Sequence, residues 1–326
     1  MTMTSPVHGG HDLAQRMEGV NFGTLSDPQP ADTKTWVERA PHTELTELQR
    51  QWREDGVVIL RNFIPADLRQ AYCEERERML PRDRSQRDNF WGGWHHPYPY
   101  MDSGTLKQLA LYRPLTEALR EVIGDELGLH LALTGWVSTE RNFHQDTYLN
   151  PPDLWSHYVA AWIALDDVHA DAGPFQFVRG SHTWNVLRRD KLMAYLTPEE
   201  REMSNWPSFT QEWVSQACEA EIARRGASVE EFIPKGGDLL IWHSNLIHRG
   251  SQPRNPELLR KSLICHYSSV KRRTDFGSSV VDPNGSHYYA FPPVDQKSPL
   301  SIETPAATTK PIPARVRELV SRLLGR

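Results

Sequence analysis

The segment from Phe143 to Thr147 carries a histidine and an aspartate two positions apart, His144 and Asp146. Side chains on an extended strand alternate between its two faces, so these two would point to one side and Gln145 to the other. A histidine from a distant strand would complete three ligands on one face of a metal, with the opposite positions open. Two histidines and one carboxylate in this arrangement are the donor set of non-haem Fe(II) oxygenases.

Such a pair alone is weak evidence, because a chain with 14 His and 42 acidic residues contains one by chance. His248 is the candidate for the third ligand, since it follows a glycine turn and an apolar run at 236–242. Arg260 comes twelve residues later and precedes the apolar segment 262–265. A planar, permanently charged guanidinium at the end of a strand can bind a carboxylate through two parallel hydrogen bonds. The sequence therefore offers three metal ligands and an anion-binding arginine.

The segments around these residues are predicted to be mostly strands. Short apolar runs without intervening helices favour an antiparallel sandwich or barrel over βαβ units. The expected strands are 129–139, 157–165, 174–179, 238–242 and 262–268. Before them, apolar residues recur at helical spacing over 43–55, from about 65 to 79, and over 105–123. The expected fold class is therefore mainly β with peripheral helices, an α+β protein.

We expect a single domain over residues 43–294, with a helical N-terminal part. Residues 1–42 show no periodicity, which predicts a mobile arm or a strap laid over the domain. The polar stretch 191–233 is expected to be a helix-containing insert that covers the barrel mouth as a lid. The tail 295–326 ends in apolar residues spaced among basic ones, and 311–326 is expected to form a short amphipathic helix.

Composition argues against several classes of partner. The 326 residues include 37 Lys and Arg against 42 Asp and Glu, and a net charge of −5 does not favour nucleic acid binding. The most apolar run, 158–165, is too short to cross a bilayer, and the N-terminus lacks the apolar core of a secretory signal. The 3 Cys are widely spaced, so neither a disulfide framework nor a thiolate zinc site is expected. We therefore expect a cytoplasmic protein, monomer or homodimer, with a small-molecule substrate and no nucleic acid or membrane partner.

Several blocks of the sequence resemble the phytanoyl-CoA dioxygenase family of Fe(II)- and 2-oxoglutarate-dependent oxygenases. The resemblance runs from about residue 52 to 267. Its strongest blocks are His144-Gln-Asp146, Trp162 to Val168, Gly173 to His182, Gly237 to His243 and His248 to Ser251. The resemblance implies a double-stranded β-helix core, the jelly roll of cupin-like proteins, with the two histidines and the aspartate as iron ligands.

The same resemblance implies a binding site for 2-oxoglutarate. Arg260 matches the arginine that binds the distal carboxylate, and Ser251 matches the hydroxyl beside it. The interval between His248 and Arg260 is one residue longer than the commonest family spacing, which leaves Lys261 as the alternative. Trp162 matches an aromatic position that lines the cosubstrate pocket in relatives. One more contact is expected on the strand before His144, at Thr134 or Trp136.

Candidate substrate contacts come from two stretches rich in aromatic residues. The loop 91–100 falls where relatives place residues that cover the substrate, and a second stretch follows the metal motif closely. The candidates are Trp91, Trp94, His95, Tyr98, Trp155 and His157. Stacked aromatic rings suit a flat or cationic small molecule. The alternative interpretation of the loop is a packed aromatic corner without a role in binding.

The resemblance implies a hydroxylase that acts on an unactivated C–H bond of a small specialised metabolite. Fe(II), 2-oxoglutarate and O2 would be its cofactors, and succinate and CO2 its by-products. Asp146 argues against halogenation, because related halogenases have a small residue at that position. Desaturation, epimerisation and cyclisation use the same ligands, and an acyl-CoA substrate could be met by basic runs such as 271–273. The competing classes are a non-catalytic jelly-roll binding protein and a metal-dependent hydrolase or isomerase, which would not need Arg260.

Overall fold

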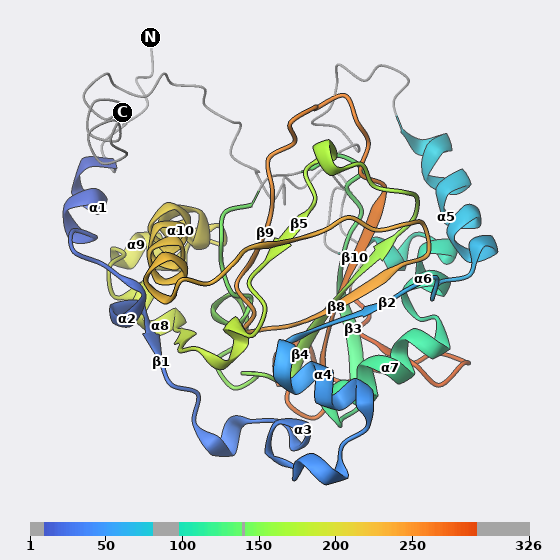
Figure 1. Ribbon diagram of the computed structural model, residues 1–326, viewed down its shortest axis with the longest axis horizontal. Helices are drawn as coiled ribbons and strands as arrows, with labels where there is room; N and C mark the ends of the chain where they lie inside the picture. Colours follow the sequence, from blue (N-terminus) through green and yellow to red (C-terminus); the bar gives the residue numbers. More distant parts are fainter. Residues whose placement is uncertain (1–9, 81–97, 139–140, 292–326) are drawn as a thin grey trace.

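The computed structural model describes residues 10–80, 98–138 and 141–291. Within these residues, two sheets carry most of the strands (Figure 1). The large sheet has the order β11 (Val280–Val281), β12 (His287–Tyr288), β3 (Leu127–Leu133), β10 (Ser262–Ser269), β4 (Tyr158–Ala164), β8 (Leu239–His243) and β2 (Val57–Leu60). The small sheet has the order β7 (Glu230–Phe232), β5 (Phe175–Phe177) and β9 (His248–Gly250). Neighbouring strands are antiparallel, except for the parallel pair β12 and β3.

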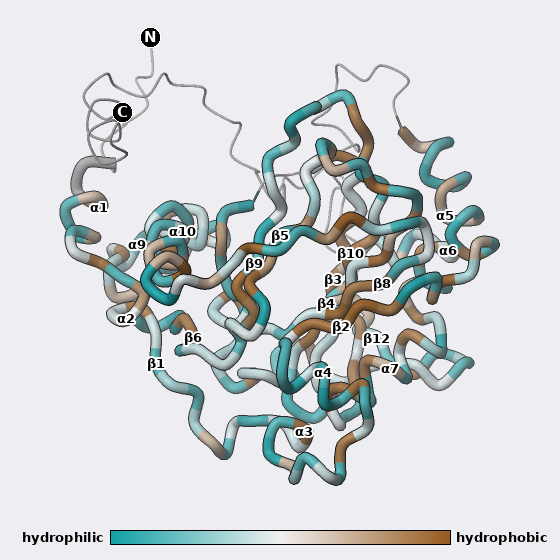
Figure 2. Tube along the Cα trace, in the orientation of Figure 1, coloured by the Kyte–Doolittle hydropathy of each residue, from teal (hydrophilic) through white to brown (hydrophobic). Residues whose placement is uncertain are grey.

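The two faces of the large sheet belong to different hydrophobic clusters. In β4, Ala160 and Trp162 join an inner cluster that also contains Phe175 and Phe232 of the small sheet. Because this cluster takes residues from both sheets, the sheets pack face to face. The alternate residues of β4, such as Ala161, join an outer cluster with the helices. Figure 2 shows the resulting hydrophobic character of β2, β8 and β10 in the middle of the molecule.

Four helices cover the outer face of the large sheet: α4 (Glu47–Asp55), α5 (Ala66–Met79), α6 (Gly104–Ala110) and α7 (Arg113–Ile123). The first ends at Gly56, which adopts φ 68° and so closes the helix in a conformation that favours glycine. The single helix expected over 105–123 is wrong. The helix breaks after Ala110 because the ring of Pro114 cannot be accommodated against the carbonyl four residues earlier.

A third hydrophobic cluster joins the N-terminal segment to the region expected as an insert. It brings together α1 (Gly10–Arg16), α2 (Phe22–Leu25), α8 (Arg189–Met193) and α10 (Trp206–Arg225). The short α9 (Pro198–Glu202) lies between the last two, and β1 (Ser26–Asp27) pairs with β6 (Val186–Leu187). Figure 1 shows α8, α9 and α10 on the side of the molecule opposite α5, α6 and α7. The lid role and the domain boundaries stay predictions.

The architecture is a mixed α+β fold with large sheets and peripheral helices, which confirms the expected class at that level. None of the helices in the described ranges is both long enough and apolar enough to cross a membrane. The C-terminal helix expected at 311–326 lies outside the described residues.

Candidate metal centre

His144 and His248 come from two segments that pair through their backbones. The N–H of His144 donates to the carbonyl of His248 at 3.1 Å, and the N–H of His248 donates back at 3.0 Å. We expected an extended backbone at both His144 and Asp146. The prediction is wrong for Asp146, which has φ −76° and ψ −22°. The backbone turns there, and the N–H of Asp146 donates to the carbonyl of Ser244 at 2.8 Å. One strand-like residue and one turn therefore place the two side chains on the same side.

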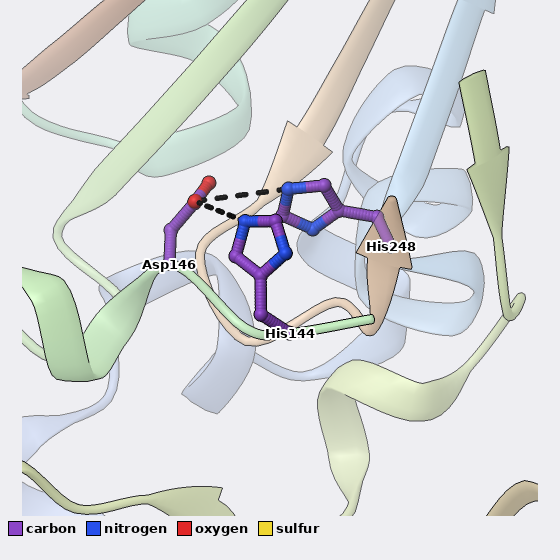
Figure 3. A group of neighbouring side chains, drawn as sticks. All are labelled: His144, Asp146 and His248. Atoms are coloured by element: carbon purple, nitrogen blue, oxygen red, sulfur yellow. Dashed lines mark ion pairs between the residues drawn. The ribbon is translucent and has the colours of Figure 1, made fainter. Parts of the chain in front are cut away.

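The three side chains converge on one point (Figure 3). Nε2 of His144 lies 3.6 Å from Oδ1 of Asp146, and Nε2 of His248 lies 3.7 Å from the same oxygen. All three donor atoms lie within 4.8 Å of one another, and all three residues are buried. Among the described residues, no other set of His, Cys, Asp and Glu side chains comes together in this way. Donor atoms that each bind at about 2 Å can share one ion at such separations.

Contacts behind the ligands fix which atoms face the centre. Nδ1 of His144 donates to the carbonyl of Asn142 at 2.7 Å, and Nδ1 of His248 donates to the carbonyl of Leu246 at 2.9 Å. In each neutral imidazole the proton is then on Nδ1, and the Nε2 lone pair faces Asp146. The indole Nε1 of Trp242 donates to Oδ2 of Asp146 at 3.0 Å, which leaves Oδ1 for a metal.

The protonation states of the site suit a cation. Burial alone would raise the pKa of Asp146, but its interactions with the nearby imidazoles of His248 and His144 outweigh the effect of burial and hold that pKa well below its usual range. Burial lowers the pKa of His248 to about 3. At neutral pH the site therefore offers a carboxylate and a neutral imidazole, which are the forms that bind metals.

Gln145 points away from the ligands, as the alternation argument predicted. Its amide nitrogen donates to the carbonyls of Asn245 at 2.8 Å and Asn185 at 3.2 Å, and its oxygen accepts the N–H of Leu187 at 2.7 Å. This side chain ties the segment that carries the ligands to β6 and to the turn after β8.

Arg260 is a buried cation without a carboxylate partner in the described part of the chain. Nη1 donates to the carbonyl of Gly173 at 2.7 Å, while Nε has no hydrogen-bond partner there. Burial lowers the pKa of Arg260 to about 10, and no acidic group offsets this effect. Lys261, the alternative, instead pairs with Glu77 at 3.0 Å and lies over the ring of Trp136. Of the two alternatives, Arg260 is therefore the one that lacks a counter-ion among the described residues.

The sequence matches the Phytanoyl-CoA dioxygenase (PhyH) family over residues 52–262, which is more than half of the chain. The chain belongs to the phytanoyl-CoA dioxygenase family. This match confirms the resemblance seen in the sequence blocks. Among curated proteins, none matches the sequence significantly.

Solved structures that resemble this member of the phytanoyl-CoA dioxygenase family share its fold at low identity. EctD from S. alaskensis with 2-oxoglutarate and 5-hydroxyectoine is 18% identical with a TM-score of 0.53, over 76% of this chain and 88% of that chain. The apoform of EctD from the same organism is 18% identical with a TM-score of 0.52, over 80% of this chain and 90% of that chain. A weaker likeness, with a TM-score of 0.48 at 18% identity, is to the epimerase SnoN in complex with Fe3+, alpha ketoglutarate and nogalamycin RO, over 75% of this chain and 96% of that chain.

The other residues that the family resemblance assigns to 2-oxoglutarate are buried. Oγ of Ser251 donates to the carbonyl of Pro174 at 2.7 Å. Thr134 Oγ1 and Trp162 Nε1 have no hydrogen-bond partner, so two buried donors are left for another molecule. Gly173 packs closely here, since a Cβ on it would lie 2.6 Å from the carbonyl oxygen of Ser251.

The candidate substrate residues are scattered. Trp91, Trp94 and His95 lie outside the described residues. The ring of Tyr98 stacks on Phe291 with centroids 4.0 Å apart. The guanidinium of Arg188 lies 3.9 Å from the centre of the Trp155 ring. None of these contacts joins a candidate to the three ligands.

His157 is buried, and burial, followed by the charge of Arg272, lowers its pKa to about 4. Both of its ring nitrogens lack a hydrogen-bond partner in the structure. The next residue, Tyr158, hydrogen-bonds to His266, and the negative charge of Asp146 acts on both of these residues. The structure therefore brings Tyr158 to the ligand side, rather than the predicted His157.

The list of site candidates leaves out a group of polar side chains close to the ligands: His130, Asn150, Tyr158, His266 and Arg273. Arg273 was considered only as part of the basic run 271–273. A signal for two of them was available. Trp162 was assigned to the cosubstrate site, and Tyr158 lies four residues before it on the same face of β4. His266 lies opposite Ala160, which is also on that face. Extending the alternation along β4 and across to β10 would have identified both residues.

Proposed function

We propose that the protein is a dioxygenase that uses Fe(II) and 2-oxoglutarate, built on a double-stranded β-helix core. The observation that carries this proposal is the convergence of His144, Asp146 and His248, with both Nδ1 atoms tied to backbone carbonyls. Neutral imidazole and carboxylate donors on one face of an ion suit Fe(II) and leave positions for a cosubstrate and O2. Family membership over residues 52–262 supports the same assignment.

The residues that would hold 2-oxoglutarate are equally suited to it. A buried guanidinium without a counter-ion is costly unless an anion binds it, and Arg260 is such a group among the described residues. A carboxylate of the cosubstrate would supply the missing charge and the missing hydrogen-bond acceptor. Thr134 and Trp162 add two donors whose partners are not in the structure.

The iron and its cosubstrate supply the oxidising power when bound, and the chain supplies geometry and a dry environment. The inner cluster, with Trp162, Phe175 and Trp242, surrounds the ligands with apolar rings that exclude water. Asp146 would offer the metal its Oδ1, because Trp242 donates to Oδ2. We propose hydroxylation of a C–H bond in a small molecule as the reaction. Desaturation, epimerisation and cyclisation use the same ligands, and product analysis would distinguish them.

An anaerobic titration of the protein with Fe(II) and 2-oxoglutarate tests the proposal. We expect the weak visible charge-transfer band that forms when both bind at one centre. Arg260→Ala should raise the 2-oxoglutarate concentration at half-maximal band at least tenfold, because it removes the charged partner of the distal carboxylate. Arg254→Ala is the matched control, since that arginine pairs with Asp171 at the surface.

A folded protein that shows no band would overturn the assignment as an oxygenase. An unchanged titration of Arg260→Ala would overturn only the role of that arginine. A non-catalytic binding protein would show the band but would release no succinate in the presence of O2.

A further inference from the structure

A second buried arginine lies beyond the opposite end of β10. Arg260 precedes the first residue of this strand, Ser262, and Arg273 follows the last, Ser269. Eight residues of strand separate them by roughly 24 Å at about 3.4 Å per residue. Arg273 therefore cannot share the anion site of Arg260 and needs a different explanation.

Arg273 belongs to a group that we call the β10 polar cluster, consisting of His130, Tyr158, His266 and Arg273. All four are buried, and they come from β3, β4, β10 and the segment after β10. The register between β3 and β10 shifts at His266, so the bulge in this ladder lies within the cluster. Such irregularities often re-aim side chains beside functional sites.

His266 presents an unpaired donor inside this cluster. Burial raises the pKa of Tyr158 well above its ordinary value, so its hydroxyl keeps its proton, and this hydroxyl hydrogen-bonds to Nδ1 of His266. Burial lowers the pKa of His266 to about 4, so the imidazole is neutral, and with the Tyr158 hydroxyl as donor to Nδ1 its one proton is on Nε2. That buried Nε2 has no hydrogen-bond partner in the structure.

Arg273 is held in place by four neighbours and still has N–H groups without a partner among the residues that the structure describes. Nη1 donates to Oδ1 of Asn150 at 3.0 Å and lies 3.4 Å from Nε2 of His130. Nε lies 3.1 Å from a carboxylate oxygen of Asp275, and the guanidinium lies 3.9 Å from the centre of the Phe276 ring. A guanidinium has five N–H groups, and those of Nη2 have no partner among the described residues.

The cluster is connected to the metal centre through two intervening residues, Asn150 and Trp242. The amide of Asn150 donates to the backbone carbonyl of Asp146 at 2.9 Å, while its oxygen accepts from Arg273. The ring of Trp242, which donates to the Asp146 carboxylate, lies 5.8 Å from the ring of His266. A molecule that contacts His266 and Arg273 would therefore lie next to the metal.

We infer that the β10 polar cluster recognises a carboxylate of the substrate, and that the substrate class is a small organic acid with a flat apolar part. This inference rests on the proposed function. The unpaired groups of the cluster are donors, on His266 and Arg273, and such donors match an anionic acceptor. An ammonium group would find no unpaired carboxylate there, because Asp275 already pairs with Arg273. Phe276 supplies a half-buried ring for the apolar part.

Calorimetric titration of the full chain tests the inference, with Fe(II) and saturating 2-oxoglutarate bound under anaerobic conditions. The probes are pairs that differ only in the charged group: benzoate with benzylamine, and 3-phenylpropionate with 3-phenylpropylamine. The charge-transfer band is recorded during each titration, so that displacement of 2-oxoglutarate from Arg260 is seen separately. We expect at least one carboxylate to bind ten times more tightly than its amine, with the band retained.

Arg273→Gln should weaken that carboxylate at least tenfold, whereas Arg272→Gln, which removes a charge at the exposed neighbouring position, should change its affinity less than twofold. His266→Phe is an independent arm that removes the Nε2 donor, and it should weaken the carboxylate at least fivefold. In both Arg273→Gln and His266→Phe, the 2-oxoglutarate concentration at half-maximal band should stay within twofold of the wild-type value.

Three results would overturn the inference. These are amines that bind as tightly as their carboxylates, equal effects of the two arginine variants, or a wild-type protein that shows the band but binds no carboxylate of the set. If the band itself is missing, the proposed function fails instead, so the two failures are distinguishable.

Discussion

His144 and His248 exchange two backbone hydrogen bonds, of 3.1 and 3.0 Å, so the main chain rather than the metal sets the distance between these two ligands. The ring centroids lie 4.4 Å apart as a result. A site that is preorganised in this way should keep its shape when one of the ligand side chains is replaced.

We therefore expect His248→Gln to abolish the response to metal while the fold persists. Fe(II) should raise the melting temperature of the wild-type protein, since a ligand that binds only the folded state stabilises it. The variant should show no such rise, and its metal-free melting temperature should lie within a few degrees of wild type. Scanning calorimetry with and without Fe(II) measures both. His182→Gln, at a buried histidine outside the ligand set, should keep the metal response.

Trp242→Phe should weaken metal binding without removing a ligand. The change deletes the Nε1 donor to Asp146, so Oδ2 is left buried without that partner and the carboxylate is free to turn. Loss of a contact behind a ligand typically costs about 10- to 100-fold in metal affinity. Competition with a chelator measures that affinity. Trp52→Phe is the control, because its buried indole has no hydrogen-bond partner in the structure, and an equal loss in both variants would contradict the role of Trp242.

The metal-free protein should lose stability as the pH falls from 7 to 5. Burial lowers the folded-state pKa of His182 to about 3 and that of His157 to about 4, against an unfolded value near 6.5. Below 6.5 the unfolded chain therefore binds more protons than the folded one, and the free energy of unfolding decreases. Each fully buried histidine contributes about 2 kcal/mol over this interval.

Urea denaturation at the two pH values measures the difference. His182→Gln should flatten the pH dependence by about one such increment. His169→Gln is the surface control, since that side chain is 63% exposed. A free energy of unfolding that stays constant between pH 7 and 5 would contradict the expectation.

Glu38→Ala should loosen the segment between α2 and α4 from the body of the protein. Oε2 of Glu38 accepts from the hydroxyl of Ser156 at 2.6 Å, and Oε1 lies 3.7 Å from Nε2 of His243. Burial would raise the pKa of Glu38, but the contacts with His243 and Ser156 outweigh it and lower that pKa to about 2. Removing the carboxylate leaves buried partners unpaired, at a cost of about 1–3 kcal/mol each.

Limited proteolysis should then cut within residues 26–46 faster than in wild type. The exposed Glu47→Ala, which loses only an ion pair with Arg50 at the surface, should leave the rate unchanged. Equal cleavage rates in both variants would show that Glu38 does not hold the segment.

The ligands could be predicted from the sequence because each has a local signature, a short motif next to an apolar run. The path of the backbone could not be predicted. Asp146 shows the reason, because its turn depends on a hydrogen bond to the carbonyl of Ser244, which is distant in sequence. Pro114 indicates the helix break before Arg113. The apolar residues keep helical spacing on both sides of it, however, and that spacing predicts one continuous helix. Arg273 stands in the basic run 271–273, but nothing in the sequence predicts its burial, which depends on Asn150, His130 and Asp275 together. Long-range polar packing of this kind has no period in the sequence.

Gln29 reaches across the molecule to the turn behind the metal ligands, where its oxygen accepts from the amide of Asn245, 216 residues away. Its own amide donates to Ser156 at 2.8 Å. During translation at about 5–20 residues per second, the partner turn leaves the ribosome roughly 10–40 seconds after Gln29 does. The N-terminal segment therefore cannot form this contact until most of the chain has been made. In nascent chains that stop before Asn245, we expect that segment to stay exposed and accessible to chaperones and proteases.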